Sequence, residues 1–282
     1  MVEMQFLKIV VLASSLLVSL LLASCGGPSA AEKHFAAGVE FQEQGRLNSA
    51  VAEFDEAIRL NPEDAAAYYN RGITYDSQGQ FELAIQDYDQ AVLLDPEDAD
   101  SYNNRGTAYD VLGRHQRAIQ DFDQAVRLDP ENAVLRFNRG IAHKNLRQFE
   151  LAVQDYDEAI RLDSLYAAAF NNRGSAYDNL AQHQRAIQDY DQAILLDPGS
   201  SLAYNNRGIS HLRLEKLDLA SQDFDQAILL DPKYASAYYN RALGLTLLNN
   251  DVDARKNVER AVELGFDRDE IEQAIEAVKS GR

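Results

Sequence analysis

The feature that most constrains this chain is a sequence repeat of 34 residues. A glycine and, twelve residues after it, an alanine return in six successive units: Gly38, Gly72, Gly106, Gly140, Gly174 and Gly208, with Ala50, Ala84, Ala118, Ala152, Ala186 and Ala220. A fixed period of this length is typical of a solenoid, in which each unit packs only on its neighbours. Because a solenoid presents an extended surface instead of one deep pocket, the period favours a binding protein over an enzyme.

Each unit has the pattern of two helices joined by a turn. With Ala31 as position 1, position 8 is Gly, position 11 is aromatic or His, positions 20 and 27 are Ala, position 24 is Phe or Tyr, and position 32 is Pro. In the second unit, Ala84, Tyr88 and Ala91 lie on one apolar helical stripe. Pro96 cannot continue that helix, so it ends the unit.

This pattern resembles the tetratricopeptide repeat (TPR). The resemblance implies an all-α fold, a right-handed superhelix of six to seven helix-turn-helix repeats that forms a single domain. The expected repeats are residues 31–64, 65–98, 99–132, 133–166, 167–200, 201–234 and a degenerate 235–266. Apolar residues at helical spacing after residue 266 predict a C-terminal capping helix over residues 267–282.

The N-terminus has the pattern of a secretory leader. Residues 9–22 are an apolar run that is too short to span a bilayer. The run ends in Leu22-Ala23-Ser24-Cys25, which resembles the lipobox of bacterial lipoproteins. The resemblance implies that residues 1–24 are a signal peptide, that Cys25 is lipidated, and that residues 25–30 are a short membrane tether. The alternative is an ordinary secretory leader in which Cys25 is incidental.

The charge of the chain limits its partners. The chain has 45 acidic and 27 basic residues, a formal net charge of -18. Nucleic acid is disfavoured because its phosphates require Lys and Arg. We therefore expect protein or peptide partners, neutral or basic in charge, and contact with the membrane through the lipid anchor alone.

Two polar positions repeat in register and predict ion pairs between repeats. Position 7 is Arg in repeats 2 to 7, and position 23 is acidic in repeats 1 to 6. Because every Arg has an acid in the preceding repeat, we expect the pairs Glu53 with Arg71, Asp87 with Arg105, Asp121 with Arg139, Asp155 with Arg173, Asp189 with Arg207, and Asp223 with Arg241. Partly exposed pairs contribute about 0.2 to 1 kcal/mol each, so they would set the geometry more than the stability.

Position 6 is Asn in six repeats, although Asn inside a helix costs up to about 0.7 kcal/mol relative to Ala. In TPR structures the first helix lines a concave groove, so the resemblance implies that these amides bind the backbone of an extended peptide. The expected groove residues are Asn70, Asn104, Asn138, Asn172, Asn206 and Asn240 at position 6, Tyr69, Asn103, Phe137, Asn171, Asn205 and Tyr239 at position 5, and Asp76, Asp110 and Asp178 at position 12. The alternative is that the Asn residues only bond neighbouring repeats or solvate the inner face.

The sequence contains no motif for catalysis, for a nucleotide or for a metal site, so we expect no enzyme activity, no cofactor and no metal. His143 and His211 both occupy position 11, two repeats apart, and are interpreted as substitutes for a packing Tyr. The Asp residues at positions 25 and 31 are interpreted as a solvated acidic face.

Together these features predict a non-catalytic adaptor or scaffold lipoprotein that binds proteins at the bacterial cell envelope. It would face the periplasm or the exterior. In a Gram-negative envelope, Gly26 after the cysteine favours the outer membrane. The alternatives are an assembly factor for outer-membrane complexes, similar to a pilotin or a barrel-assembly protein, and an oligomeric structural spacer.

Overall fold

The computed structural model describes residues 27–281, which form helices, turns and connecting segments without a strand. Residues 1–24, Cys25 and Gly26 lie outside this range, so the structure does not describe the expected leader and lipidation site. The helices are α2 (Ala30–Glu43), α3 (Leu47–Leu60), α4 (Ala65–Ser77), α5 (Phe81–Leu94), α6 (Ala99–Val111), α7 (His115–Leu128), α8 (Ala133–Asn145), α9 (Phe149–Leu162), α10 (Ala167–Asn179), α11 (His183–Leu196), α12 (Ser201–Arg213), α13 (Leu217–Leu230), α14 (Ala235–Leu247), α15 (Asp251–Glu263) and α16 (Arg268–Ser280). Among these described helices, none is long and apolar enough to cross a bilayer.

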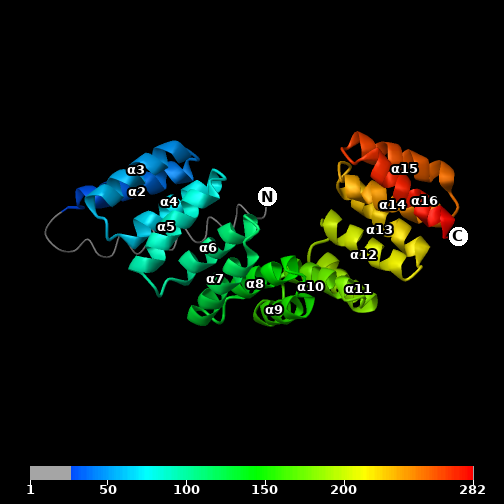
Figure 1. Cartoon of the computed structure of the whole chain (residues 1–282), viewed down its shortest axis with the longest axis horizontal. Coiled ribbons are helices and arrows are strands. Elements are labelled where there is room, and N and C mark those ends of the chain that lie inside the picture. The colour runs from blue at the N-terminus through cyan, green and yellow to red at the C-terminus, as the bar shows by residue number, and fades with distance from the viewer. Residues whose placement is uncertain (1–26, 282) are drawn as a thin grey trace. The chain divides into compact units, whose positions relative to one another are not determined.

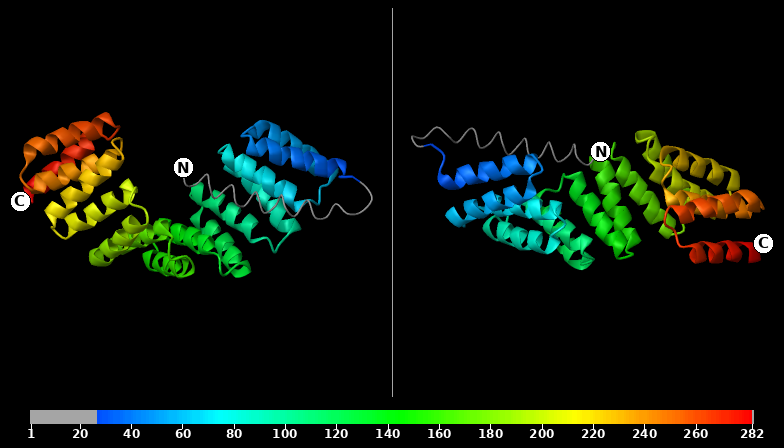
Figure 2. Two further views of the ribbon diagram at one scale, coloured as in Figure 1. Left: turned by 180° about the vertical axis from the view of Figure 1, so that it is seen from behind. Right: turned by 90° about the horizontal axis from the view of Figure 1, so that it is seen from above.

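The helices alternate between the first and the second helix of a repeat, as Figures 1 and 2 show. Several first helices start directly after a side chain that can accept hydrogen bonds from free backbone N–H groups. The Asp64 carboxylate accepts from Ala66 N at 3.1 Å and from Ala67 N at 3.3 Å. Asp98, Asn132 and Ser200 cap the later first helices in the same way. These caps follow the turn that ends the preceding repeat, so α4, α6, α8 and α12 begin at the first position of their repeats, whereas α2 begins one residue earlier, at Ala30.

The turn from the first to the second helix needs one residue with positive φ. Gly45, Gly79 and Gly113 fill this position at φ near +70°. From the fourth repeat on, the same position holds a residue with a side chain, namely Arg147, Ala181, Glu215 and Asn249 at φ +56° to +60°. These later turns carry backbone strain that a glycine would not have.

The two helices of a repeat pack closely because a glycine meets an aromatic ring. In the fourth repeat, a Cβ atom on Gly140 would lie only 2.6 Å from Cε1 of Tyr156, and Tyr156 is fully buried. Ala152 and Ala159 on the same second helix are also fully buried. Small residues therefore bring the helices together around one large ring, which explains the repeated Gly, Ala and aromatic positions.

The described residues form two compact units, residues 27–112 with α2 to α6 and residues 113–281 with α7 to α16. In the first unit α4 contacts both α2 and α6, and in the second unit α10 contacts α8 and α12, while α12 contacts α14. Within each unit, no such contact joins the described second helices of neighbouring repeats. First helices therefore lie closer together than second helices, so each unit curves with its first helices on the inner side.

The second unit ends in a packed cap. Ile271 of α16 is fully buried and packs with Ala242, Val258 and Ala261 of the last repeat. The capping helix lies mainly against α14, and Phe266 just before it stacks on Tyr239 with ring centroids 5.4 Å apart.

Candidate functional site on the first helices

In repeats 2, 4, 5 and 6, an arginine at position 7 holds the two helices of the repeat together. In the second repeat, Arg71 Nε donates to Asp87 Oδ2 at 2.8 Å and Arg71 Nη2 donates to Asp87 Oδ1 at 2.6 Å. The same two-pronged contact joins Arg139 to Asp155, Arg173 to Asp189 and Arg207 to Asp223. The carboxylate of each pair is almost completely buried. This contact lies within one repeat because position 7 of the first helix faces position 23 of its own antiparallel second helix.

The remaining guanidinium nitrogen reaches back to the preceding repeat, but to position 25. Arg71 Nη1 lies 2.5 Å from Asp55 Oδ1, and Arg139 Nη1 lies 2.7 Å from Asp123 Oδ1. The equivalent inter-repeat pairs are Asp89 with Arg105, Asp157 with Arg173, Asp191 with Arg207 and Asp225 with Arg241. Each position-7 arginine of repeats 2, 4, 5 and 6 therefore joins three helices.

The predicted ladder of position 23 with the next repeat was wrong in its partners. Glu53 contacts His34 of its own repeat at 2.6 Å instead of Arg71. Arg241 has no acid at position 23 of its own repeat, where Asn257 stands instead. It contacts Asn257 at 3.2 Å as well as Asp225. Asp155, Asp189 and Asp223 were likewise expected to pair with the next repeat and instead bind the arginine of their own repeat. The position-25 aspartates, interpreted from the sequence as a solvated face, are the inter-repeat partners.

Two further groups surround each arginine. The Arg71 guanidinium lies 5.7 Å from the ring centroid of Tyr68 and 6.0 Å from that of Tyr75, within range of cation–π attraction. Burial opposes the charge of Arg71, but hydrogen bonds and charge from Asp87 and Asp55 outweigh burial and raise its pKa. The guanidinium therefore stays charged under all ordinary conditions.

The position-11 histidines occupy the place of Tyr75 beside such an arginine–aspartate pair. His143 Nε2 lies 3.7 Å from Asp155 Oδ2, and His211 Nε2 lies 3.6 Å from Asp223 Oδ2. Burial lowers the pKa of His211, although the charge of Asp223 opposes that shift. Each histidine thus stands where a packing tyrosine stands in other repeats.

The position-6 asparagines make hydrogen bonds inside the protein. Asn104 Nδ2 donates to Tyr69 Oη at 3.1 Å. Asn206 and Asn240 donate to the position-5 amide oxygens of the preceding repeat, Asn171 and Asn205, at 3.1 and 2.9 Å. Asn70 and Asn172 donate to the backbone oxygens of Ala66 and Ala168, and Asn138 is half-buried. The bonds of Asn104, Asn206 and Asn240 join neighbouring repeats, as the alternative interpretation expects, whereas those of Asn70 and Asn172 stay within their own helices.

Two of the six position-5 residues are buried and the other four are half-buried. Asn171 and Asn205 are buried, so their side chains belong to the interior of the second unit. Phe137 packs on Tyr156 and Tyr166, with centroid distances of 5.8 and 4.8 Å. The capping segment covers Tyr239, and Asn103 donates to the neighbouring Asn104. A ligand on this face would therefore contact position 5 only at its half-buried members.

The position-12 aspartates bind the tyrosine at position 24. Tyr88 Oη donates to Asp76 Oδ2 at 2.7 Å, and Tyr190 Oη donates to Asp178 Oδ2 at 3.0 Å. Asp178 also accepts from Ser210 Oγ at 2.7 Å and lies 2.9 Å from His183 Nδ1. Burial raises the pKa of Asp76 to about 6, and the Tyr88 hydrogen bond only partly offsets this effect. Asp110, the third residue predicted here, is half-buried.

The first-helix face of the second unit combines amide oxygens with exposed apolar side chains. Within the described part of the chain, no hydrogen bond reaches Oδ1 of Asn206 or Asn240. Leu202 at position 2 is exposed on α12, the helix that carries Asn206, and Val134 is exposed at position 2 of α8. This face can accept hydrogen bonds from a peptide backbone or a basic side chain and can cover small apolar groups, but it holds no reactive pair of groups.

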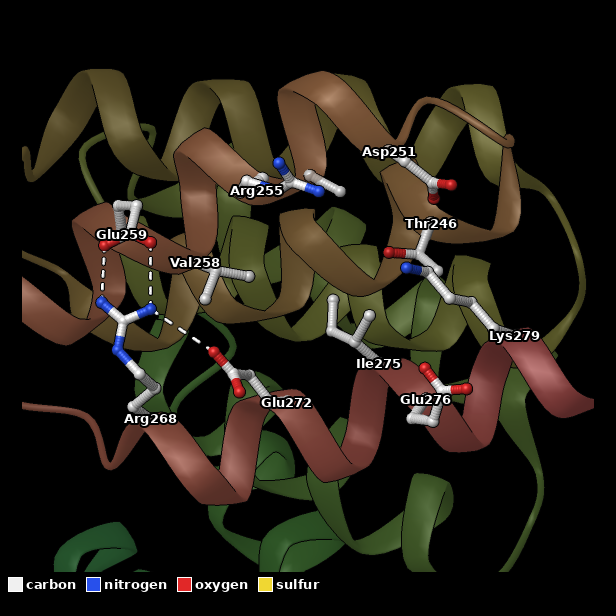
Figure 3. Close-up of a pocket in the computed structure, with 11 residues that line it drawn as sticks. Thr246, Asp251, Arg255, Val258, Glu259, Arg268, Glu272, Ile275, Glu276 and Lys279 are labelled. Carbon is white, nitrogen blue, oxygen red and sulfur yellow. Dashed lines mark hydrogen bonds and ion pairs between the residues drawn. The ribbon is translucent and has the colours of Figure 1, made fainter.

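A cavity of about 290 Å³ lies between α15 and α16, away from the predicted groove residues (Figure 3). Val258 and Ile275 point into it, and the bidentate pair of Arg268 with Glu259, at 2.6 and 2.9 Å, lies at one end. The charged groups on its rim are of both signs. Among residues 27–281, no three His, Cys, Asp or Glu side chains are placed to hold a metal ion.

Sequence reasoning identified the arginines and the position-23 acids but missed the role of position 25. The signal was present, because Asp55, Asp89, Asp123, Asp157, Asp191 and Asp225 repeat in the six units that precede an arginine. The acids at positions 23 and 25 lie two residues apart on one helix, and both precede every position-7 arginine by one repeat, so the repeat pattern did not choose between them. Only the direction in which each side chain leaves the helix separates them.

Comparison with known proteins gives one consistent fold. The chain is 29% identical to YrrB, described as a TPR protein with an unusual peptide-binding site, over 65% of this chain and 95% of that one, with a TM-score of 0.55. It is 27% identical to MamA over 58% and 96% of the two chains, with a TM-score of 0.54. A tetratricopeptide repeat protein from Parabacteroides merdae shares the fold at 19% identity, with a TM-score of 0.71 over 89% and 99% of the chains.

The search of functionally curated proteins found no match. Family profiles described as tetratricopeptide repeat match residues 35–92, 71–133, 133–164, 167–200 and 201–234, which together make up more than half of the chain. The chain belongs to the tetratricopeptide repeat family.

Proposed function

We propose that this chain is a non-catalytic scaffold that binds neutral or basic protein segments at the bacterial cell envelope, tethered to the membrane through Cys25. The observation that carries the binding role is the first-helix face of the second unit. There, half-buried Asn206 keeps an amide oxygen free of internal bonds one helical turn from exposed Leu202 on α12, and Asn240 on α14 also keeps its amide oxygen free. YrrB, at 29% identity, is described as having a peptide-binding site, which supports the same class of ligand here.

The chemistry of the face selects the ligand. Free amide oxygens accept hydrogen bonds, so they suit backbone N–H groups and the side chains of Lys, Arg and Asn. The net charge of -18 attracts basic segments and repels acidic ones. The ligand expected from both features is an extended segment with small apolar side chains and a neutral or positive charge.

The binding role is tested by selecting peptides from a random phage library on the purified full-length chain in mild detergent. The affinity of an enriched peptide is then measured by fluorescence anisotropy. We expect Leu202→Asp to weaken the peptide at least tenfold, because Leu202 lies on the first-helix face. Leu151→Asp is the matched control: Leu151 is exposed to a similar degree but lies on a second helix. Equal losses in both variants, or enrichment of acidic peptides, would contradict the proposal.

The envelope location rests on the leader sequence and on Cys25. Several acyl chains on one cysteine would anchor the protein firmly, whereas a single chain binds a membrane only marginally. In cells fed radiolabelled palmitate, we expect label in the wild-type protein and none in Cys25→Ser. The wild-type protein should also fractionate with membranes, and with the outer membrane in a Gram-negative cell. Unlabelled wild-type protein would refute lipid anchoring and leave the peptide assay unaffected.

A further inference from the structure

The second helices carry an outward-facing stripe that repeats at positions 22, 26 and 29. Two positions of this stripe, 26 and 29, are three residues apart on the helix, so their side chains are neighbours. In α9 they are Glu158 and Arg161, which form an ion pair at 2.8 Å. In α3 they are Glu56 and Arg59, and in α15 they are Arg260 and Glu263, each again paired.

On α11 and α13 the same two positions carry no charge. Position 26 is Gln192 on α11 and Gln226 on α13, and position 29 is Leu195 and Leu229. Leu195 is 70% exposed and Leu229 is 71% exposed, as much as Arg59 and Arg161, whose side chains are 65% and 58% exposed. Position 22 adds an exposed glutamine to each helix, Gln188 and Gln222.

Packing does not explain these leucines. The fold accepts an arginine at the same position, with the same exposure, in the first and fourth repeats. A leucine that is seven-tenths exposed therefore gains little from burial in the isolated chain. Single exposed leucines are common, but here two neighbouring repeats place them at the same position, on two helices that both pack against α12.

We propose that these six residues form an interface with a second copy of this chain. The interface, here called the Gln–Leu patch, consists of Gln188, Gln192, Leu195, Gln222, Gln226 and Leu229. It lies on the second helices, so it is separate from the first-helix face and does not depend on the proposed function.

Hydrogen bonding favours a second copy as the occupant, and the lack of charge on the patch limits the repulsion between two acidic chains. Two chains of net charge -18 repel each other, so they can approach most closely where neither carries charge. Each glutamine amide has both donors and an acceptor, so the patch can pair with an identical patch turned by a two-fold axis. A basic partner would be better served by the many acidic residues elsewhere on the chain.

The size of the patch sets the strength of the dimer. The patch covers eight residues on each helix, 188–195 and 222–229, or about 12 Å, so its two stripes offer less than the roughly 800 Å² per partner of a stable interface. The dimer is therefore weak and reversible, and it forms only at a high concentration of the chain. Charged pairs on α9 and α15 limit the patch on either side.

The test is sedimentation velocity of the full-length chain in mild, density-matched detergent, over a hundredfold range of concentration up to about the millimolar level of weak complexes. We expect the wild-type mass to rise from one chain towards two. The variant Gln192→Glu/Leu195→Arg/Gln226→Glu/Leu229→Arg transfers the pair of the fourth repeat onto both helices, and it should remain monomeric. Because α9 folds with this pair, the variant should keep its helical circular dichroism and its affinity for a selected peptide.

Two further variants locate the interface. Gln90→Glu/Leu93→Arg makes the same change at the same positions of α5, where Leu93 is also 70% exposed, and it should self-associate like the wild type. Glu158→Gln/Arg161→Leu extends the patch to α9 and should tighten the dimer several-fold. The proposal is overturned if the wild type stays monomeric throughout, which would leave the patch to a different partner. Self-association of the fourfold variant, or its loss in the α5 variant, overturns it equally.

Discussion

The two aspartates that bind Arg139 should contribute very different amounts to stability. Asp155 lies in the same repeat as Arg139, and its side chain is only 5% exposed. It accepts hydrogen bonds from Nε at 2.9 Å and from Nη2 at 2.6 Å. Asp123 lies in the preceding repeat, is 50% exposed, and accepts one hydrogen bond at 2.7 Å. Asparagine has nearly the same shape as aspartate, so Asp155→Asn and Asp123→Asn remove charge with little change in packing.

The magnitudes follow from burial. Breaking a buried ion pair by removing one partner costs about 3 to 5 kcal/mol. Arg139 keeps Asp123 and its side chain is partly exposed, so we expect about 2 to 3 kcal/mol for Asp155→Asn. The half-exposed Asp123 is screened by water, so Asp123→Asn should cost about 0.2 to 1 kcal/mol.

The assay is urea unfolding of the full-length protein in mild detergent at pH 7, followed by circular dichroism. Repeat proteins can unfold in parts, so variants are compared only where the slope against urea matches that of the wild type. A double-mutant cycle that combines each substitution with Arg139→Leu measures the coupling of each pair. Equal costs for the two aspartates, or a larger coupling for Asp123, would refute the assignment of the buried partner to the same repeat.

Three further predictions concern single positions and use the same unfolding assay. Gly140→Ala should destabilise the chain by about 1 to 3 kcal/mol, because the new methyl group would lie 2.6 Å from the ring of Tyr156. Gly244→Ala should stabilise it by up to about 1 kcal/mol through helix propensity, because the nearest atom there is 3.4 Å away. The reverse order of the two effects would contradict the packing argument. Ala181→Gly should stabilise by about 1 kcal/mol because residue 181 has φ +56°, and a loss of stability would disprove strain at this turn. Asp76 has a pKa of about 6 in the folded state, above the ordinary 3.8, so its ionisation weakens the fold as pH rises from about 4 to about 6. Asp76→Asn should therefore stabilise the fold by about 1 kcal/mol at pH 7, a value reduced for partial exposure, and should have no effect at pH 4. Asp178→Asn should instead destabilise the fold at pH 7, because Asp178 accepts hydrogen bonds from two hydroxyls and contacts a histidine. The argument fails if both variants respond alike.

The sequence by itself determined the repeat, the helix pairs and the spacing rules. The 34-residue period predicted first helices that begin at Ala65, Ala99 and Ala133, and the structure starts helices at these residues. This worked because helix starts, turns and the glycine–ring contact depend on residues within one repeat. A local signal that returns six times is easily separated from chance.

The sequence was also sufficient to identify the charged residues that join helices, but it did not assign their partners. Arg71 has an acid sixteen residues away in both directions, Asp87 ahead of it and Asp55 behind it. Both separations are compatible with a contact in a stack of repeats. The structure shows that the arginine binds both acids, with the buried one in its own repeat.

Only the tertiary structure decided which side chains of the first helices face a ligand. Asn171 and Asn206 differ by one repeat and one position, yet Asn171 is buried and receives the hydrogen bond of Asn206. The sequence places both on first helices and predicts both for the groove. Their exposure depends on how closely the next repeat approaches. That distance is set by packing between repeats, and no spacing along the chain encodes it directly.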